Sequence, residues 1–121
     1  MSRILIAEDE PMLREVYTTL LEAHGHEVEG VENGLRVIEL CDKVVFDLLL
    51  LDIMMPEMTG VEVLEKARER SMKLPPTIVF SNLSSGSEID RARELGVRQC
   101  VVKSDMTPSD IVALVDSVLH R

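Results

Sequence analysis

Aromatic residues are scarce in this chain, which has one Tyr, two Phe and no Trp among 121 residues. Any hydrophobic core must therefore consist mainly of Leu, Ile, Val and Met, which the 45% hydrophobic content supplies. No apolar stretch approaches the ~18 residues of a membrane span. The N-terminus leads straight into a strand pattern, so no signal peptide is predicted. Residues 1–121 are expected to form one domain with no membrane segment.

Basic residues are also in the minority, with 13 Lys and Arg against 22 Asp and Glu, which gives a net charge of −9. Such a chain is not expected to bind nucleic acid, which rewards basic patches. If the acidic groups gather in a pocket, a cation is the natural partner. The chain has only two cysteines, Cys41 and Cys100, both in apolar contexts. We expect buried free thiols instead of a disulfide, which fits a reducing cytoplasm.

Short apolar runs alternate five times with amphipathic stretches. The apolar runs are typical of strands and lie near residues 3–8, 27–31, 46–51, 77–80 and 99–102. The amphipathic stretches predict helices that start after Pro11, Asn33-Gly34, Thr59, Ser87 and Thr107. The second apolar run is interleaved with charge, which favours an edge position. The alternation predicts an α/β fold in which a parallel sheet is covered by helices on both faces.

Two helix boundaries have clear local signals. Pro11 suits a first helical turn, and Gly25 suits the C-terminal cap of the same helix. At the start of the last helix, Thr107 can cap, Pro108 fits the first position, and Asp110 lies where a capping-box acid would.

Polar residues follow four of the predicted strands. Glu8 and Asp9 end the first strand, Asp52 the third, Ser81 the fourth and Lys103 the fifth. Ligands of parallel α/β sheets bind outside the carboxyl ends of the strands. Each residue alone has an ordinary explanation as a turn, capping or solvated residue. Their joint placement at one edge of one sheet favours a functional site.

The electrostatics of this edge indicate a use. Two carboxylates ~5 Å apart repel each other by roughly 3 kcal/mol at an effective dielectric of ~20. Three such groups would hold either a proton or a cation, and all-oxygen ligands favour a hard cation, Mg²⁺ over Zn²⁺. With the ammonium of Lys103 and the hydroxyl of Ser81, the site suits a phosphoryl group. Asp52 could itself act as the nucleophile, because carboxylates do form aspartyl-phosphates.

Over nearly its whole length, the chain resembles the receiver domains of two-component response regulators. The matching motifs are ILIAEDE at 4–10, LDIMMPEMTG at 51–60, VFS at 79–81 and VVK at 101–103. The Asp-x-x-Met-Pro-x-Met-x-Gly stretch is highly specific, and the other motifs gain weight from their order and spacing. The resemblance implies a flavodoxin-like, doubly wound (βα)5 fold of five parallel strands in the order 2-1-3-4-5.

The resemblance also implies a role for each matching residue. Asp52 would accept a phosphoryl group from a histidine kinase or phosphotransfer protein. Mg²⁺ would be bound by Asp9, Asp52 and the backbone carbonyl of Met54, with Glu8 acting through a metal-bound water. Lys103 would pair with Asp52 at rest and with the phosphoryl group afterwards.

Ser81 would move to bind the phosphoryl oxygen, and this movement would shift the face made by the fourth helix, fifth strand and fifth helix. A downstream protein target, not identified by the sequence, would read that change in the cytoplasm. A homodimer through the same face is left open. The domain would catalyse its own phosphorylation and hydrolyse its own aspartyl-phosphate, without being an enzyme in the classical sense.

The chain departs from the family pattern at two positions. Cys100 stands where an aromatic residue is usual, three residues before the lysine. Ser104 replaces the usual Pro after the lysine. Because a cis bond before a residue other than Pro costs ~3–4 kcal/mol, we predict a trans Lys103–Ser104 bond and a reshaped loop. Met54 and Leu83, two residues beyond Asp52 and Ser81, are apolar. In the family these two positions line the path of the attacking water, so the resemblance implies that apolar side chains there position the water poorly and slow dephosphorylation.

Three other functions fit parts of the pattern. A degenerate receiver would bind a partner without being phosphorylated, and Cys100 and Ser104 keep this alternative open. A Mg²⁺-dependent phosphatase with an aspartate nucleophile would typically carry a second acid where Met54 stands. A flavin-binding protein of similar architecture would need a phosphate loop where Glu8, Asp9 and Glu10 would repel phosphate.

Overall fold

A computed structural model describes residues 2–82 and 86–120 of the chain. The strands are β1 (Arg3–Ala7), β2 (Glu27–Val31), β3 (Leu48–Asp52), β4 (Thr77–Ser81) and β5 (Gln99–Val102). The helices are α1 (Pro11–Ala23), α2 (Gly34–Lys43), α3 (Gly60–Glu69), α4 (Ser87–Glu94), the short 3₁₀ helix η1 (Lys103–Asp105) and α5 (Pro108–Leu119). The predicted alternation is therefore confirmed.

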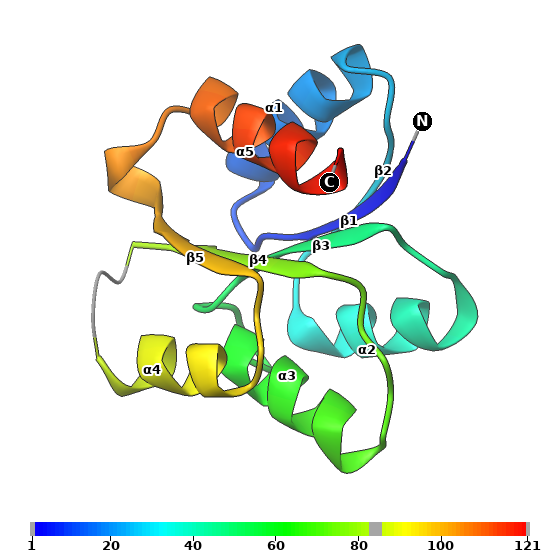
Figure 1. The fold of residues 1–121 in the computed structure, drawn as a ribbon, viewed down its shortest axis with the longest axis vertical. Coiled ribbons are helices and arrows are strands. Elements are labelled where there is room, and N and C mark those ends of the chain that lie inside the picture. Colours follow the sequence, from blue (N-terminus) through cyan, green and yellow to red (C-terminus); the bar gives the residue numbers. More distant parts are fainter. Residues whose placement is uncertain (1, 83–85, 121) are drawn as a thin grey trace.

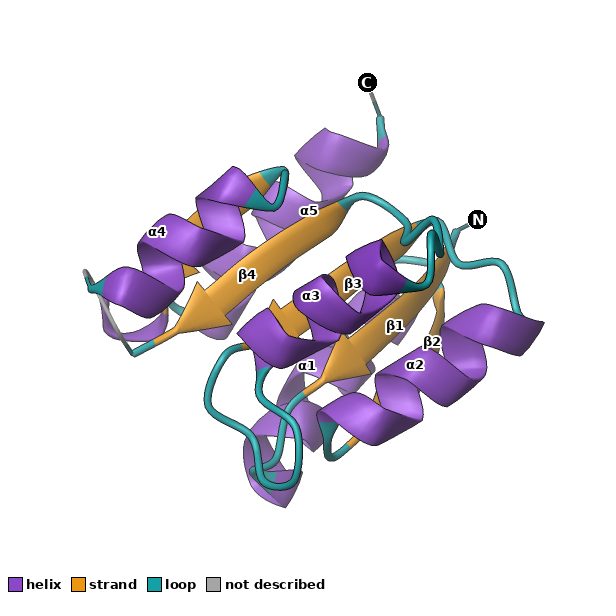
Figure 2. Ribbon diagram, turned by 90° about the horizontal axis from the view of Figure 1, so that it is seen from below, coloured by secondary structure: helices purple, strands orange, loops and turns teal. Residues whose placement is uncertain are grey.

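All five strands are parallel and lie in the order β2-β1-β3-β4-β5. This is the predicted strand order, and it places the charge-interleaved β2 at an edge. Helices α1 and α5 cover one face of the sheet, and α2, α3 and α4 cover the other (Figures 1 and 2). The fold is thus the predicted doubly wound α/β sheet.

The central strand β3 shows why the sheet needs cover on both faces. Leu49 and Leu51 pack into the core on the α2–α3–α4 side, and Leu48 and Leu50 pack into the core on the α1–α5 side. All four leucines are fully buried. Because side chains alternate along a strand, a continuous apolar run supplies both cores at once.

The main difference from the predicted boundaries is at the start of β3. The apolar run predicts a strand from residue 46, whereas β3 begins at Leu48. Phe46 is still buried in the core. The carboxylate of Asp47 instead accepts a hydrogen bond from the backbone N–H of Arg3 at 2.7 Å. At this position the apolar run correctly indicates which residue is buried, but it does not correctly indicate where the strand begins.

The predicted helix boundaries are confirmed. Pro11 begins α1, and Gly25 follows its end with a φ of 89°, a left-handed conformation that glycine adopts without strain. Thr107 and Asp110 form a reciprocal capping box at the start of α5.

The cysteine prediction is half right. Cys41 and Cys100 are free thiols, but both are only partly buried instead of buried. Burial raises the pKa of Cys41 to about 11. It also raises the pKa of Cys100, although Arg93 opposes this. Both thiols therefore stay protonated near neutral pH.

None of the helices in the described residues is long and apolar enough to span a membrane.

Candidate functional site

Three carboxylates gather where β1 and β3 end, as the sequence predicts. Glu8 directly follows β1, and its backbone N–H donates to the carbonyl of Val31 at 3.0 Å. Asp52 is the last residue of β3. One carboxylate oxygen from each of Glu8, Asp9 and Asp52 lies within 4.8 Å of the others. Among residues 2–82 and 86–120, this is the one group of acids, histidines or cysteines with metal-binding spacing.

The three carboxylates differ in exposure. Glu8 and Asp52 are almost completely buried, at 1% and 3% exposure, while Asp9 is exposed. A buried carboxylate is stable only when charges or hydrogen bonds compensate it. Two of the three acids therefore need a partner, and the third opens the group to solvent.

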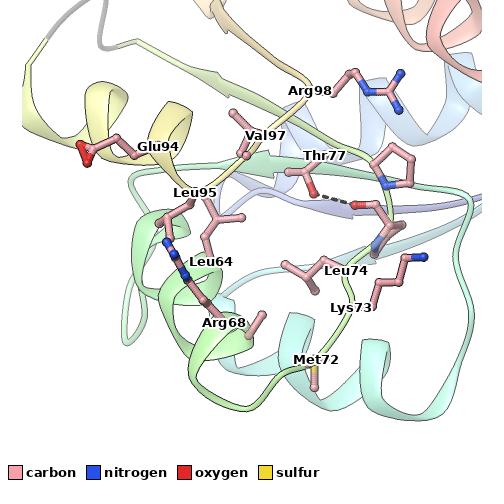
Figure 3. Close-up of a pocket in the computed structure, with 14 residues that line it drawn as sticks. Leu64, Arg68, Met72, Lys73, Leu74, Thr77, Glu94, Leu95, Val97 and Arg98 are labelled. Carbon is pink, nitrogen blue, oxygen red and sulfur yellow. Dashed lines mark hydrogen bonds between the residues drawn. The ribbon is translucent and has the colours of Figure 1, made fainter.

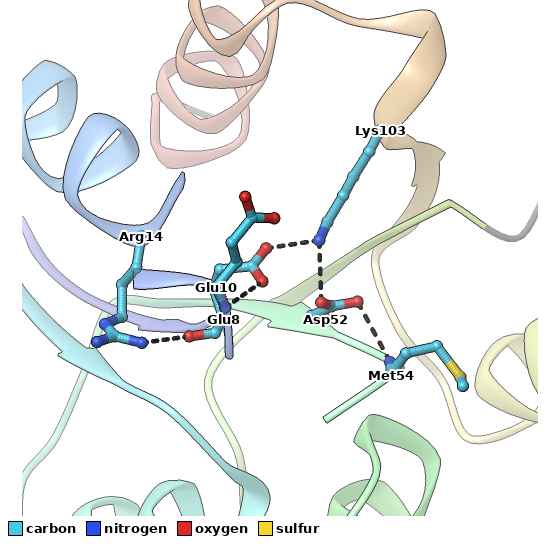
Figure 4. A network of polar contacts seen from close by, with 6 residues as sticks. All are labelled: Glu8, Glu10, Arg14, Asp52, Met54 and Lys103. Atoms are coloured by element: carbon cyan, nitrogen blue, oxygen red, sulfur yellow. Dashed lines mark hydrogen bonds and ion pairs between the residues drawn. The ribbon is translucent and has the colours of Figure 1, made fainter. Parts of the chain in front are cut away.

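Lys103 is that partner, and it joins both buried acids. Its ammonium Nζ lies 2.5 Å from Oε1 of Glu8 and 2.9 Å from Oδ2 of Asp52 (Figure 4). The predicted pairing of Lys103 with Asp52 is present. The sequence did not predict the pair with Glu8, which was expected to act mainly through a metal-bound water.

Further hydrogen bonds hold the two acids in place. The other oxygen of Glu8 accepts from the backbone N–H of Glu10 at 3.0 Å. Arg14 donates from Nη1 to the carbonyl oxygen of Glu8 at 2.7 Å. Asp52 accepts at Oδ1 from the backbone N–H of Met54 at 3.3 Å. These contacts hold Glu8 from the α1 side and Asp52 from the loop after β3 (Figure 4).

The pKa directions follow from burial and charge. Burial raises the pKa of both Glu8 and Asp52, although the hydrogen bonds from Lys103 oppose it. Burial lowers the pKa of Lys103, but the two carboxylates outweigh it and the net direction is upward. Lys103 therefore stays charged, and burial makes the carboxylates of Glu8 and Asp52 more ready to take up a proton.

The aromatic ring of Phe80 supports the same ammonium. Lys103 Nζ lies 4.9 Å from the centroid of this ring, within the range of a cation–π contact. Tyr17 packs edge-on against Phe80, with ring centroids 5.3 Å apart. Two of the few aromatic residues in the chain thus lie beside the acidic site, which nothing in the sequence had indicated.

Ser81 and Met54 lie at the same edge of the sheet. Ser81 is the last residue of β4 and is fully buried. Met54 lies in the loop after β3 and is 56% exposed. Leu83 lies outside the described residues.

The two departures from the family pattern also have structural outcomes. The Lys103–Ser104 bond is trans, as predicted, since the described residues contain no cis peptide. The loop that follows is wound into η1, where the Met106 N–H donates to the Lys103 carbonyl at 3.2 Å. Cys100, in β5, packs against the core on the α2–α3–α4 side.

The donor set fits a hard divalent cation. Carboxylate and carbonyl oxygens are what Mg²⁺ prefers, and it commonly keeps several waters. Exposed Asp9 lies with the buried acids Glu8 and Asp52, so three carboxylates beside one ammonium offer oxygen atoms within 4.8 Å of one another. The residues present therefore suit Mg²⁺.

Comparison with known proteins identifies the family. Residues 4–116 match the family model described as response regulator receiver domain. The chain belongs to the response regulator receiver domain family. The family prediction is thereby confirmed, and the chain is the receiver domain of a two-component response regulator.

Several relatives are similar over the whole chain. The transcriptional regulatory protein CpxR homolog of Haemophilus influenzae is 33% identical, over 100% of this chain and 52% of its own length. ResD of Bacillus subtilis, another transcriptional regulatory protein, is 32% identical, over 99% of this chain and 49% of its own. The receiver domain therefore spans about half the length of these relatives.

Solved structures agree. A CheY-like receiver domain protein from Methanospirillum hungatei has a TM-score of 0.86 at 27% identity, covering 99% of this chain and 94% of that one. A DNA-binding response regulator of the LuxR family from Staphylococcus aureus has a TM-score of 0.86 at 27% identity, covering 98% of this chain and 99% of that one.

Proposed function

We propose that this receiver domain, residues 1–121, is a phosphoryl-accepting switch in which Asp52 takes a phosphoryl group from a histidine kinase or phosphotransfer protein. The observation that carries the proposal is the placement of a buried aspartate between a charged lysine and two further acids. Lys103 Nζ lies 2.9 Å from Asp52, and Glu8 and Asp9 lie within 4.8 Å of it. Such an aspartate is both reactive and surrounded by groups that stabilise the charge of a phosphoryl group.

The transfer step would begin with attack by a carboxylate oxygen of Asp52 on phosphorus. The P–N bond to the donor histidine would break, and its electron pair would return to the imidazole nitrogen, which is then free to take a proton. Lys103 would transfer one of its hydrogen bonds from Asp52 to a phosphoryl oxygen while keeping Glu8 as its partner. The pair with Glu8 would therefore hold the ammonium in position throughout.

Mg²⁺, when bound, would neutralise charge shared by the phosphoryl oxygens and the acids. Asp9, Asp52 and the carbonyl of Met54 would hold it directly, with Glu8 acting through a bound water. Ser81 would donate its hydroxyl to a phosphoryl oxygen. Later hydrolysis of the acyl phosphate would return the domain to its resting state.

The output would be a changed α4–β5–α5 face, read in the cytoplasm by a downstream protein or by a second copy of the chain. Ser81 and Lys103 connect the site to this face, because Ser81 is the last residue of β4 and Lys103 directly follows β5. Binding of nucleic acid by this domain itself is not part of the proposal.

The decisive experiment is phosphorylation with acetyl phosphate and Mg²⁺, followed by intact mass measurement. We expect one added phosphoryl group on the wild-type chain and none on Asp52→Asn. Asp42→Asn, an exposed acid on α2, serves as the matched control and should label normally.

Two results would contradict the proposal. An unlabelled wild-type chain that also fails to respond to beryllofluoride would indicate a binding module that works without phosphorylation. Steady turnover of unrelated phosphate esters would indicate a phosphatase.

A further inference from the structure

A second concave site lies at the opposite end of the sheet from Asp52. It is a cavity of about 610 Å³ between the C-terminal ends of α3 and α4 and the segments that lead into β4 and β5. Strand β4 connects the two ends of the sheet, since it starts at Thr77 in this groove and ends at Ser81 in the acidic site. The groove shares no residue with the acidic site.

The floor of the groove is apolar and made of side chains that the fold leaves partly uncovered. Met72, Leu74, Leu95 and Val97 pack against the core on the α2–α3–α4 side but are only partly buried. Leu64, from α3, is buried beneath them. Apolar area that remains accessible in a hollow is available to a ligand.

The rim carries three cations, Arg68, Lys73 and Arg98. All three are exposed. Within the described part of the chain, their side chains make no ion pair or side-chain hydrogen bond. The one acid of the rim, Glu94, lies 3.7 Å from Arg91 and is thus already paired with another cation.

Three cations without a carboxylate partner thus line one groove of a chain whose net charge is −9. Arg3, Arg36, Lys66, Arg91 and Lys103 all have a carboxylate partner within 4.0 Å. Arg14, Lys43, Arg70 and Arg93 also have no carboxylate partner among the described residues, but none of them lines the groove. The groove is therefore distinguished by bringing three such cations together over an apolar floor.

The walls of the groove are also ordered before any ligand arrives. Pro75 and Pro76 fix the backbone that enters β4, and the hydroxyl of Thr77 donates to the Pro75 carbonyl at 2.9 Å (Figure 3). The Pro76 carbonyl accepts from the Leu49 N–H at 2.9 Å. A pre-formed groove lowers the conformational cost of binding.

We propose that this groove binds an acidic segment of a partner protein that carries bulky apolar side chains. The apolar side chains would lie on the floor, and the carboxylates of the segment would pair with Arg68, Lys73 and Arg98. In Figure 3, Lys73 and Arg98 extend away from Arg68 instead of converging on one point. Spread cations suit several carboxylates along a chain better than one compact anion.

The groove is poorly suited to nucleic acid. Single strands usually bind on aromatic side chains, and Tyr17, Phe46 and Phe80 all lie outside the groove. The acidic remainder of the molecule would also repel a phosphate backbone.

The test is fluorescence anisotropy with a short labelled peptide of alternating glutamate and leucine. Two control peptides each change one property. A peptide of alternating lysine and leucine keeps the apolar side chains but carries positive charge. A peptide of alternating glutamate and serine keeps the negative charge but lacks the apolar side chains. We expect the glutamate–leucine peptide to bind most tightly, and its affinity to fall as salt is added.

Variants locate the site. Each of Arg68→Gln, Lys73→Gln and Arg98→Gln should weaken binding about two- to fivefold, the range of an exposed ion pair. The triple variant should weaken it by tenfold or more, on the order of the product of the single effects. Lys43→Gln, an exposed cation on α2 that lies outside the groove, should leave binding unchanged. Circular dichroism of each variant checks that the fold is retained.

Four results would overturn the proposal. The first is binding of the lysine–leucine peptide as tight as that of the glutamate–leucine peptide. The second is unchanged binding by the triple variant. The third is binding to vesicles of anionic phospholipid in place of the peptide. The fourth is a dimer, seen by sedimentation, that the triple variant abolishes while no peptide binds, because the occupant would then be a second copy of this chain. None of these results depends on phosphorylation of Asp52.

Discussion

The ammonium of Lys103 lies 2.5 Å from Glu8, a residue 95 positions earlier in the chain. The same ammonium also pairs with Asp52 at 2.9 Å. One cation therefore compensates two buried carboxylates, and its side chain is itself only 12% exposed. The resting site is thus a cluster of three charged residues. Removing any one of them changes the net charge that surrounds the other two.

Replacing the lysine should expose this dependence. Without divalent cations, Lys103→Met should lower the free energy of unfolding by about 3 kcal/mol, because two buried carboxylates lose their shared partner. Burial already raises the pKa of Glu8 and Asp52. The folded variant should therefore take up protons more readily than the unfolded chain, and its deficit should shrink as the pH falls.

Urea unfolding of Lys103→Met at about pH 8 and about pH 5 measures this effect. Lys43→Met, at an exposed position of α2, should change stability by less than about 0.5 kcal/mol. An equal deficit at both pH values would show that lost packing, not uncompensated charge, causes the effect.

Gly60 should not tolerate a side chain. A Cβ there would lie 2.9 Å from the Cα of Ile53 and closer still to the carbonyl oxygen of Asp52. Gly60→Ala should therefore cost about 1–3 kcal/mol of stability, as overpacking does, and should slow labelling of Asp52 by shifting its backbone.

Gly30→Ala is the control, because its Cβ would lie 3.2 Å from Cδ of the flexible Arg14 side chain and make only an ordinary contact, 3.6 Å, with Cγ2 of Ile6. We expect a stability change below about 1 kcal/mol for this variant, with normal labelling by acetyl phosphate. Similar losses in both glycine variants would mean that close approach to Asp52 is not what requires Gly60.

Asp116 joins the end of α5 to the turn after α1. Its two carboxylate oxygens lie 2.7 Å from Nδ1 of His24 and 2.7 Å from Nε2 of His26. Burial raises the pKa of Asp116, but the hydrogen bonds from the two histidines outweigh this and the net direction is downward. Because the pKa is lower in the folded chain, the contribution of the carboxylate is complete above its unfolded value, about 4. It is lost as the pH falls through the lowered folded value.

Asp116→Asn should therefore cost about 1 kcal/mol near neutral pH, as expected for a hydrogen-bonded carboxylate that is partly exposed. The difference from the wild type should shrink below about pH 4. Thermal unfolding across this pH range, with Asp42→Asn as the exposed control, measures it. A gap between the two proteins that does not vary with pH would rule out the carboxylate charge as its source.

Met54 should govern the lifetime of the aspartyl-phosphate. It follows Asp52 by two residues and is 56% exposed beside the site, and its thioether offers little to orient a water molecule. Met54→Asn should shorten the lifetime of the acyl phosphate, measured by loss of the added mass after the phosphodonor is removed. Met54→Leu, which keeps the site apolar, should leave the lifetime close to that of the wild type. An unchanged lifetime in Met54→Asn would contradict this role.

The strand ends were predictable for a simple reason. In a parallel sheet, all carboxyl ends lie at one edge, so Glu8, Asp52, Ser81 and Lys103 had to lie near one another once the strands were recognised. The contacts inside that edge were not predictable. Whether Lys103 pairs with one acid or two depends on side-chain directions that strand periodicity does not specify.

The amino-acid order alone determined the five-fold alternation, the two-sided burial of Leu48–Leu51, the helix caps and the edge that holds the acids, because each depends on local periodicity or on residue chemistry at one position. Only the tertiary structure decided the rest. Four features join residues that are far apart in the chain. They are the ammonium of Lys103 shared by two acids, the Phe80 ring beside it, the contact of Asp116 with His24 and His26, and the groove between α3 and α4. Distances across such separations are set by how helices pack on the sheet, and a linear pattern carries no measure of them.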